Sequence, residues 1–181
     1  MTGRLRIIAG SWRRRQLSFP DRPGLRPTPD RVRETLFNWL GPRVIGARCL
    51  DLFAGSGALG FEAASRGAAE VVMVERDREV ARALRDNVER LQATNIEVVR
   101  DDALRVLHAL AGPFDIVFLD PPFGTDLLER ACADLAAPGR LAPDARVYLE
   151  TDRPQPPPLP SGWELLRREK AGRVRYHLAA C

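Results

Sequence analysis

Short apolar runs alternate with amphipathic segments along most of the chain. From residue 48 onward, the apolar runs that read as strands lie within 49–60, where the strand runs into glycines, and within 70–77, 96–103, 114–120 and 145–152. Between them, apolar residues recur at three- and four-residue intervals, most clearly in 78–92, and predict helices. Strands this apolar leave no face for solvent. The pattern therefore predicts an α/β, Rossmann-like fold: a mostly parallel sheet with helices on both faces.

The start of the chain follows a different pattern. Residues 4–19 read as two short strands around Gly10, which predicts a β-hairpin, and a loop rich in proline and glycine follows it. Thr28 and Pro29 then predict a helix over 29–40, with the hydroxyl as its cap and proline at its first position. This hairpin, loop and helix precede the alternating strands and helices.

The end of the chain also reads as antiparallel structure. Residues 163–180 predict a closing hairpin turned at Ala171 and Gly172, after a proline-rich surface loop. We expect one domain over 1–181, because a chain of 181 residues suits a single domain and shows no internal repeat. Its catalytic core is expected at 47–181.

Positive charge gathers at the start of the chain. Residues 1–48 hold 11 arginines against 3 acids, whereas the net charge of the whole chain is only +4. The abundance of arginine is itself weak evidence, because Lys170 is the only lysine and the composition favours arginine throughout. The clustering nevertheless indicates a surface for a polyanion, and residues 1–28 are the expected contact region for a nucleic acid.

Several other classes of protein are not favoured. No apolar run approaches the roughly 20 residues of a membrane-spanning helix, and the first residues do not resemble a secretory signal. The cysteines are Cys49, Cys132 and Cys181, and their odd number and wide spacing predict neither a disulfide framework nor a zinc site. We therefore expect a cytoplasmic protein, a monomer, with no membrane partner and no metal.

A glycine-rich turn follows the first strand of the core. Gly55, Gly57 and Gly60 satisfy the GxGxxG spacing between a strand and a helix, and Glu75 ends the next strand. Glycines let the backbone approach a ligand closely, and an acid on the neighbouring strand end can accept hydrogen bonds from both hydroxyls of a ribose. This arrangement predicts a site for a nucleoside-containing cofactor.

Acids near the glycine turn bear on which cofactor binds. Asp51 lies four residues before Gly55, where it would repel a phosphate and attract an ammonium or sulfonium group. S-adenosylmethionine fits this charge better than NAD, although the turn does not exclude a dinucleotide. Asp102 follows the third strand, where it could accept a hydrogen bond from adenine, cap the next helix, or do both, with Ala103 as a backbone donor.

The fourth strand stops at a corner formed by Asp120, Pro121, Pro122 and Phe123. The two prolines have fixed backbone angles and no N–H, so their carbonyls are held as acceptors. Asp120 and the Pro121 carbonyl could accept both N–H bonds of an exocyclic amino group while the base stacks on Phe123. The corner therefore predicts methylation at the amino group of a base.

The motifs together resemble a known family. "DLFAGSGALG", "VERD" and "FLDPPF" are similar to those of class I S-adenosylmethionine-dependent methyltransferases that act on amino groups of bases. The blocks "RIIAGSWRRRQL", "GLRPTPDRVRETLFNWL" and "AGRVRYHL" extend the resemblance over essentially the whole chain. In this order they resemble the bacterial RsmD family, whose members methylate the N2 amino group of one guanine in 16S ribosomal RNA.

The resemblance implies a seven-stranded sheet with its last strand antiparallel, and it implies site residues. The catalytic residues would be Asp120, Pro121, Pro122 and Phe123. The cofactor site would comprise Asp51, Phe53, Ala54, Gly55, Ser56, Gly57, Glu75, Arg76, Asp102, Ala103 and Asp120. The RNA-binding residues would be Arg6, Trp12, Arg13, Arg14, Arg15, Arg26, Thr28, Arg31 and Arg33. The segment "RPTPDRVRE" resembles the one that closes over the methionine end of the cofactor, except that Pro29 replaces the family's usual second threonine.

The sequence thus predicts an S-adenosylmethionine-dependent guanine-N2 methyltransferase whose partner is small-subunit rRNA or the assembling subunit. A methyltransferase for adenine or cytosine in DNA stays open, because such enzymes also carry the DPPF tetrapeptide. An NAD(P)-dependent oxidoreductase also fits the glycine turn, but no catalytic Tyr, Lys or His is evident. An RNA-binding module without activity would leave the DPPF corner unexplained.

Overall fold

A seven-stranded sheet forms the centre of the molecule in the computed structural model, which describes residues 2–181. Its strands lie in the order β5-β4-β3-β6-β7-β9-β8. All are parallel except β9, which runs antiparallel to both β7 and β8. The expected sheet, with its last strand antiparallel, is confirmed. The strands are β3 (Arg48–Asp51), β4 (Glu70–Val74), β5 (Ile96–Val99), β6 (Phe114–Leu119), β7 (Leu141–Thr151), β8 (Glu164–Ala171) and β9 (Val174–Ala180).

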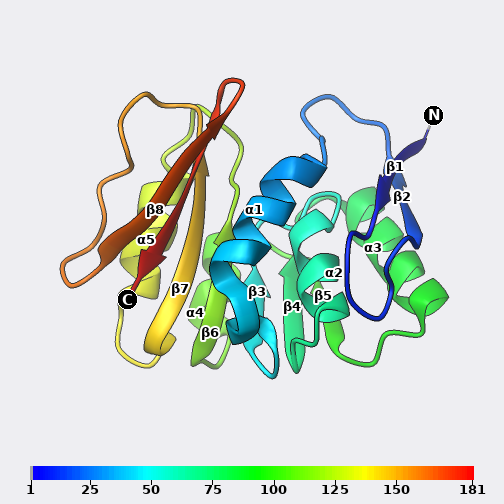
Figure 1. The fold of residues 1–181 in the computed structure, drawn as a ribbon, viewed down its shortest axis with the longest axis horizontal. Coiled ribbons are helices and arrows are strands. Elements are labelled where there is room, and N and C mark those ends of the chain that lie inside the picture. Colours follow the sequence, from blue (N-terminus) through cyan, green and yellow to red (C-terminus); the bar gives the residue numbers. More distant parts are fainter. Residues whose placement is uncertain (1) are drawn as a thin grey trace.

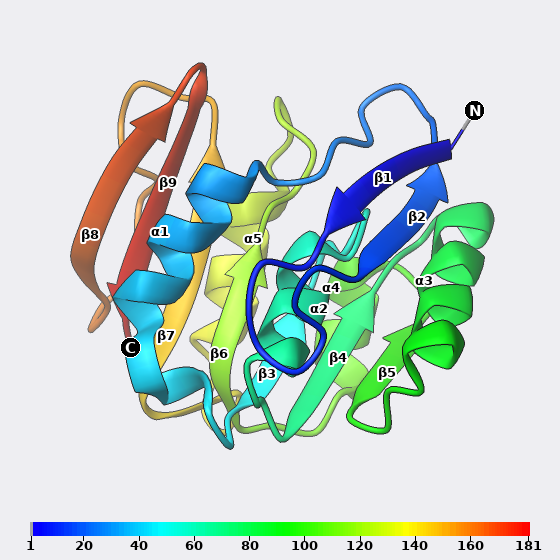
Figure 2. The same ribbon diagram turned by 45° about the vertical axis from the view of Figure 1, so that its right-hand side comes forward.

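Helices cover both faces of the sheet (Figures 1 and 2). One face carries α1 (Asp30–Leu40), α2 (Ala58–Ser65) and α3 (Arg78–Leu91), with the short 3-10 helix η1 (Gly41–Val44) after α1. The other face carries α4 (Ala103–Ala109) and α5 (Leu127–Leu135). Each layer has its own apolar cluster, one built on residues such as Leu36 and Phe118 and the other on residues such as Leu107 and Leu119. The strands are therefore buried on both sides, as their near-continuous apolar sequence predicts.

The strand order places a site at the carboxyl ends of β3 and β6. From β3 the chain proceeds outward through β4 to β5, and it then returns to the other side of β3 to form β6. The loops after β3 and β6 consequently diverge and leave a crevice between them. The glycine turn and the Asp120 corner are these two loops.

A separate two-stranded sheet lies beside the glycine-loop half of the molecule. The strands β1 (Thr2–Arg6) and β2 (Gln16–Pro20) pair antiparallel and confirm the predicted hairpin, although its connection spans residues 7–15. In Figure 2 the hairpin lies next to α3, and Asn87 of that helix exchanges hydrogen bonds with the Ser18 backbone. Gly10 (φ +81°) lies so close to α2 that a Cβ there would come within 1.8 Å of the Ser65 carbonyl.

The start of α1 differs from the prediction. The helix begins at Asp30, preceded by Pro29, and no side chain caps it. Thr28 therefore has no capping role, because it lies outside the first helical turn. Within residues 2–181, no helix combines the length and apolar character needed to cross a bilayer.

Candidate active site

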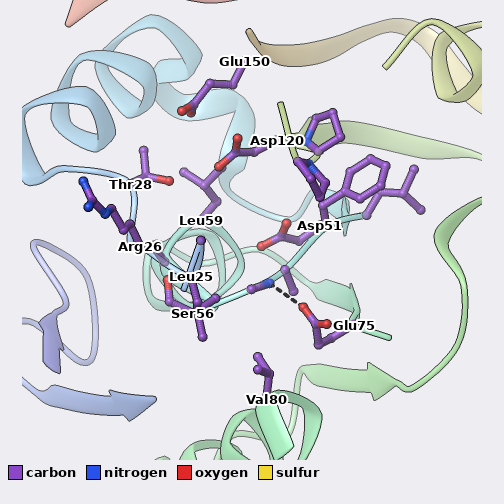
Figure 3. A pocket seen from close by; sticks show the side chains of 18 of the residues that line it. Leu25, Arg26, Thr28, Asp51, Ser56, Leu59, Glu75, Val80, Asp120 and Glu150 are labelled. Carbon is purple, nitrogen blue, oxygen red and sulfur yellow. Dashed lines mark hydrogen bonds between the residues drawn. The ribbon is translucent and has the colours of Figure 1, made fainter. Parts of the chain in front are cut away.

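A cavity of about 800 Å³ opens at the carboxyl ends of β3, β4 and β6 (Figure 3). Its wall joins the glycine turn, the end of β4, the start of α4 and the Asp120 corner. The loop between the N-terminal hairpin and α1 completes the wall with Leu25, Arg26 and Thr28. The segments that the sequence predicted as separate parts of one site thus lie around one space.

The glycines of the turn have different structural roles. Gly55 lines the cavity, whereas Gly57 is not one of its lining residues, and the contact expected between Gly57 and a cofactor stays a prediction. Gly57 has φ +78°, and a Cβ there would lie 2.6 Å from the Phe61 ring and 2.7 Å from Leu84. It is needed for the left-handed turn and for close packing of α2.

Glu75 is held rigidly at the end of β4. Its Oε2 accepts a hydrogen bond of 3.1 Å from the Gly55 amide, and its Oε1 accepts one of 2.7 Å from the Asp77 amide. Figure 3 shows the side chain on the cavity wall opposite Val80 of α3. The carboxylate thereby links the ends of two neighbouring strands and keeps further acceptor capacity for a ligand.

Asp51 is buried at the floor of the cavity, with 2% of its surface exposed. Its Oδ2 accepts a 2.9 Å hydrogen bond from the Gly60 amide. A Cβ at Gly60 would lie 2.9 Å from Met73 and 3.1 Å from that oxygen, so the third glycine makes room for the carboxyl group. Burial raises the pKa of Asp51 to about 7 despite this hydrogen bond. A bound cation would stabilise the ionised form.

The loop after β5 forms the wall of the cavity on the side of the glycine turn. Asp102 caps α4 by accepting hydrogen bonds from the amides of Leu104 and Arg105, and it also lines the cavity. Ala103 lines the cavity beside it, and Phe53, Ala54, Ser56 and Arg76 are further lining residues. The capping role predicted for Asp102 is confirmed.

The Asp120 corner closes the opposite end of the cavity. Asp120 and Pro121 line it, and the Phe123 side chain stands at its mouth with 44% of its surface exposed. Burial raises the pKa of Asp120, and the nearby Glu150 and Asp51 raise it further. The Pro122 carbonyl already accepts a hydrogen bond from the Thr125 hydroxyl at 2.8 Å, which favours the Pro121 carbonyl as the acceptor for a ligand.

Sequence reasoning missed several cavity residues. Leu25, Leu59 and Val80 supply apolar wall, and they look like ordinary core positions in the sequence. Glu150 is the most consequential omission, because it brings a further carboxyl group from β7 to the part of the cavity near Asp120. An acid following the apolar run of that strand was the only available signal. Across residues 2–181, no group of three or more His, Cys, Asp or Glu side chains is arranged to hold a metal ion.

Arg33 is wrongly predicted as an RNA contact. Its side chain is only 1% exposed and forms an ion pair with Glu62, which is fully buried in α2. The guanidinium also donates to the backbone carbonyls of Thr28 and Arg6 and to the Asp30 carboxylate. Arg33 therefore joins the hairpin, the cavity loop and α1. Four of its five N–H donors are engaged, and a side chain this deeply buried does not reach a phosphate on the surface.

Two other residues predicted to contact RNA are less exposed than expected. Thr28 is 7% exposed and lies in the cavity wall, which fits its place in the segment expected to close over a cofactor. Trp12 is half-buried, packs against the apolar core and donates its amide to the Ser65 hydroxyl. The remaining predicted RNA contacts are exposed arginines: Arg6, Arg13, Arg14, Arg15, Arg26 and Arg31.

Comparison with known proteins agrees with this architecture. A family model described as "Conserved hypothetical protein 95" matches residues 5–180. The ribosomal RNA small subunit methyltransferase D of Escherichia coli K12 is 49% identical, over 98% of this chain and 90% of the relative. The protein of the same name from Haemophilus influenzae is 46% identical, over 97% of this chain and 93% of the relative.

Solved structures give the same result. A structure titled as putative methyltransferase yhhF from Escherichia coli superposes with a TM-score of 0.91 at 49% identity and covers 98% of both chains. A putative methylase, HI0767, from Haemophilus influenzae superposes with a TM-score of 0.84 at 43% identity, again over 98% of both chains. Full-length similarity at this level confirms the resemblance seen in the motifs. The chain therefore belongs to the ribosomal RNA small subunit methyltransferase D family.

Proposed function

We propose that this protein transfers a methyl group from S-adenosylmethionine to the N2 amino group of a guanine in small-subunit rRNA. One observation carries the proposal: a single cavity connects the Glu75 end, which suits a nucleoside, with the Asp120 corner, which suits an amino group. The names of the relatives support the RNA substrate, since they are small-subunit rRNA methyltransferases. The choice of guanine and its N2 atom rests on the motif resemblance.

The residues of the cavity fit S-adenosylmethionine. Glu75 suits the two ribose hydroxyls, and Val80 and Ala103 give apolar walls for adenine. Asp51 and Asp120 place negative charge where the ligand has its sulfonium and ammonium groups. The same acids would repel a pyrophosphate, which argues against a dinucleotide. When bound, the cofactor supplies an electrophilic methyl group.

The protein's own contribution lies at the Asp120 corner. Asp120 and the Pro121 carbonyl accept the two N–H bonds of the guanine amino group, and Phe123 stacks against the ring. These bonds draw the nitrogen lone pair out of conjugation and aim it at the methyl group. As the N–C bond forms and the S–C bond breaks, one N2 proton leaves, and the Asp120 carboxylate is placed to accept it. Its raised pKa makes it a better proton acceptor than an ordinary aspartate.

The exposed arginines of the N-terminal hairpin would hold the RNA. Arg13, Arg14 and Arg15 lie in the loop between β1 and β2, and Arg6 ends β1. The loop is fixed to α2 because the amides of Ile8 and Ala9 donate to Glu62. These exposed cations would bind phosphates of the RNA while one nucleotide enters the cavity. Binding should therefore weaken steeply as the salt concentration rises.

The test is transfer of labelled methyl groups to small-subunit rRNA and to assembled particles that lack the modification. The expected product is one 2-methylguanosine per molecule, identified by nucleoside analysis and mapped to a single position. Methylated adenine or cytosine would contradict the base assignment. No transfer to either substrate, with bound cofactor demonstrated, would contradict the proposed activity.

A further inference from the structure

Glu150 is a buried acid that the reaction as described above does not use. It lies on β7 with 6% of its surface exposed, and it lines the main cavity as well as a smaller one behind the Asp120 corner. Within residues 2–181 it forms no ion pair with any arginine or lysine, although arginine is abundant. A buried carboxyl group without a cation costs stability, so its presence calls for a ligand.

The sheet fixes Glu150 directly beside Asp120. The strands β6 and β7 are parallel and pair Leu119 with Leu149, so the next residues, Asp120 and Glu150, are neighbours across the sheet. Neighbouring strands lie about 4.8 Å apart, and residues in this register project to the same face. Figure 3 shows both carboxyl groups turned toward the same part of the cavity.

One oxygen of Glu150 is positioned from behind. The Tyr148 hydroxyl, which is fully buried two residues earlier on the same face of β7, donates a 2.8 Å hydrogen bond to Oε2. No hydrogen bond within residues 2–181 engages Oε1 of Glu150. In this part of the chain, the buried side-chain atoms without a partner are Glu129 Oε2 and His177 Nδ1, so Oε1 of Glu150 is not one of them. Oε1 is thus an oriented acceptor at the cavity surface, next to the corner where the amino group would lie.

The bases that carry amino groups differ at the ring atom next to that group. In adenine and cytosine the adjacent ring nitrogen has a lone pair and no hydrogen, whereas in guanine N1 carries a hydrogen beside the N2 amino group. A carboxylate beside the amino-binding corner would accept the guanine N1–H bond and would repel the lone pair of the other two bases. The DPPF corner alone fits all three bases and leaves this choice open.

We propose that Glu150 selects guanine by accepting the N1–H hydrogen bond while Asp120 and Pro121 hold the N2 amino group. This inference rests on the proposed function, because it assumes that an amino group of a base enters the corner. It assigns the base specificity to a residue outside the DPPF tetrapeptide. Tyr148 is then a positioning residue that orients the Glu150 carboxylate.

The test replaces the target guanine by 2,6-diaminopurine in synthetic RNA ligated into the substrate. This base keeps the 2-amino group but has an N1 lone pair in place of N1–H. For the unaltered protein we expect kcat/KM to fall at least tenfold on this replacement, because N1 then faces a carboxylate. The Glu150→Gln variant can donate its amide N–H to the lone pair, so its preference for guanine should shrink or reverse.

Three further measurements separate base recognition from a structural role. Glu150→Gln should lower kcat/KM on guanine about tenfold to a hundredfold, the range of a charge-assisted hydrogen bond. It should leave the affinity for S-adenosylmethionine within a few fold and should not lower the unfolding temperature at pH 8. Glu169→Gln is the matched control, because it makes the same charge change at an exposed position on β8. In the sheet, Glu169 of β8 and Glu150 of β7 are both register partners of Tyr176 on β9, from its two sides.

The outcomes distinguish this inference from the proposed function. Equal rates on guanine and 2,6-diaminopurine with the unaltered protein would overturn the role of Glu150 and leave guanine-N2 methylation standing; this comparison needs no variant. An equal loss on both bases in Glu150→Gln would also overturn it. Methylation of an adenine or cytosine by the unaltered protein would overturn both proposals.

Discussion

The Gly55 amide donates a 3.1 Å hydrogen bond to Oε2 of Glu75, twenty residues further along the chain. This contact joins the turn after β3 to the end of β4, and it orients the carboxylate in the cavity wall. The acid is therefore positioned before any ligand arrives. Preorganisation of this kind reduces the entropy lost when a ligand binds.

We predict that Glu75→Ala weakens S-adenosylmethionine binding by about a hundredfold or more, because two hydrogen bonds to a charged acceptor are lost. Titration calorimetry measures the dissociation constant directly. Glu89→Ala, an exposed acid on α3, serves as the control. Unchanged affinity in Glu75→Ala would remove this residue from the cofactor site.

Replacement of Asp120 should separate chemistry from cofactor binding. Asp120→Ala removes an acceptor for the amino group and the proposed proton acceptor, so kcat should fall by a factor of about a thousand or more. Affinity for S-adenosylmethionine should change far less, within a few fold, since Asp51 and the ribose and adenine contacts are intact and only one of the two acids near the cationic groups is lost. Single-turnover kinetics and calorimetry on the same protein check both expectations. A variant with near-normal turnover would contradict the role of the corner.

The pKa of Asp51 predicts how stability changes with pH. Its pKa is raised by burial to about 7 from an ordinary value near 3.8, so the unfolded chain loses this proton at lower pH than the folded protein. The stabilisation is complete below pH ~4 and is lost as pH rises through 7, an effect of up to about 4 kcal/mol. Asp51→Asn should therefore raise the unfolding free energy relative to the unaltered protein more at pH 8 than at pH 5.

Urea unfolding of the ligand-free protein at the two pH values measures this difference. Equal effects of Asp51→Asn at pH 5 and pH 8 would contradict the raised pKa. The same variant should bind S-adenosylmethionine more weakly, because the floor of the cavity loses its negative charge. The ionised Asp51 would thus lower the unfolding free energy while it strengthens cofactor binding, and such a loss of stability is common for functional residues.

Charge reversal in the hairpin loop should affect RNA binding alone. Replacing Arg13, Arg14 and Arg15 by glutamate should raise the apparent KM for RNA about tenfold or more and reduce the salt dependence of binding. Reversal of Arg105 and Arg130, exposed on the helices of the other face, is the control. A fall in kcat with unchanged KM would show that the loop does not dock RNA.

Replacement of Arg33 should lower the stability of the protein, unlike charge reversal in the hairpin loop. Arg33→Met leaves the buried Glu62 with Arg66 as its remaining cation and breaks the link between α1 and the hairpin, which should cost about 3–5 kcal/mol of unfolding free energy. Arg31→Met, two residues earlier and exposed, should change stability by less than about 0.5 kcal/mol. Thermal unfolding of both variants checks this. Similar stabilities would contradict the buried network.

The contrast between these arginines shows what the sequence could and could not predict. Gly55, Glu75 and Asp120 were predicted because strand–turn motifs carry local signals, and a parallel sheet must bring such strand ends together. Arg33 was misassigned because an arginine in a charged helix reads as exposed. Its burial depends on Glu62, 29 residues away on another helix.

Glu150 was missed for a related reason. The alternation of β7 places it toward the cavity only once the register with β6 is known, and no local motif marks that register. The motif around Gly57 likewise does not separate a glycine that lines the cavity from one that permits close packing. Both features depend on contacts between elements, which the order of residues alone does not encode locally.

The central claim is that one cavity holds the cofactor with its methyl group facing the Asp120 corner. A crystal structure with S-adenosylhomocysteine, the demethylated product, tests this most directly. We predict that its ribose hydroxyls contact Glu75 and that its sulfur faces the space between Asp120 and Phe123. A nucleoside bound away from Glu75, or a sulfur directed away from Asp120, would contradict the account.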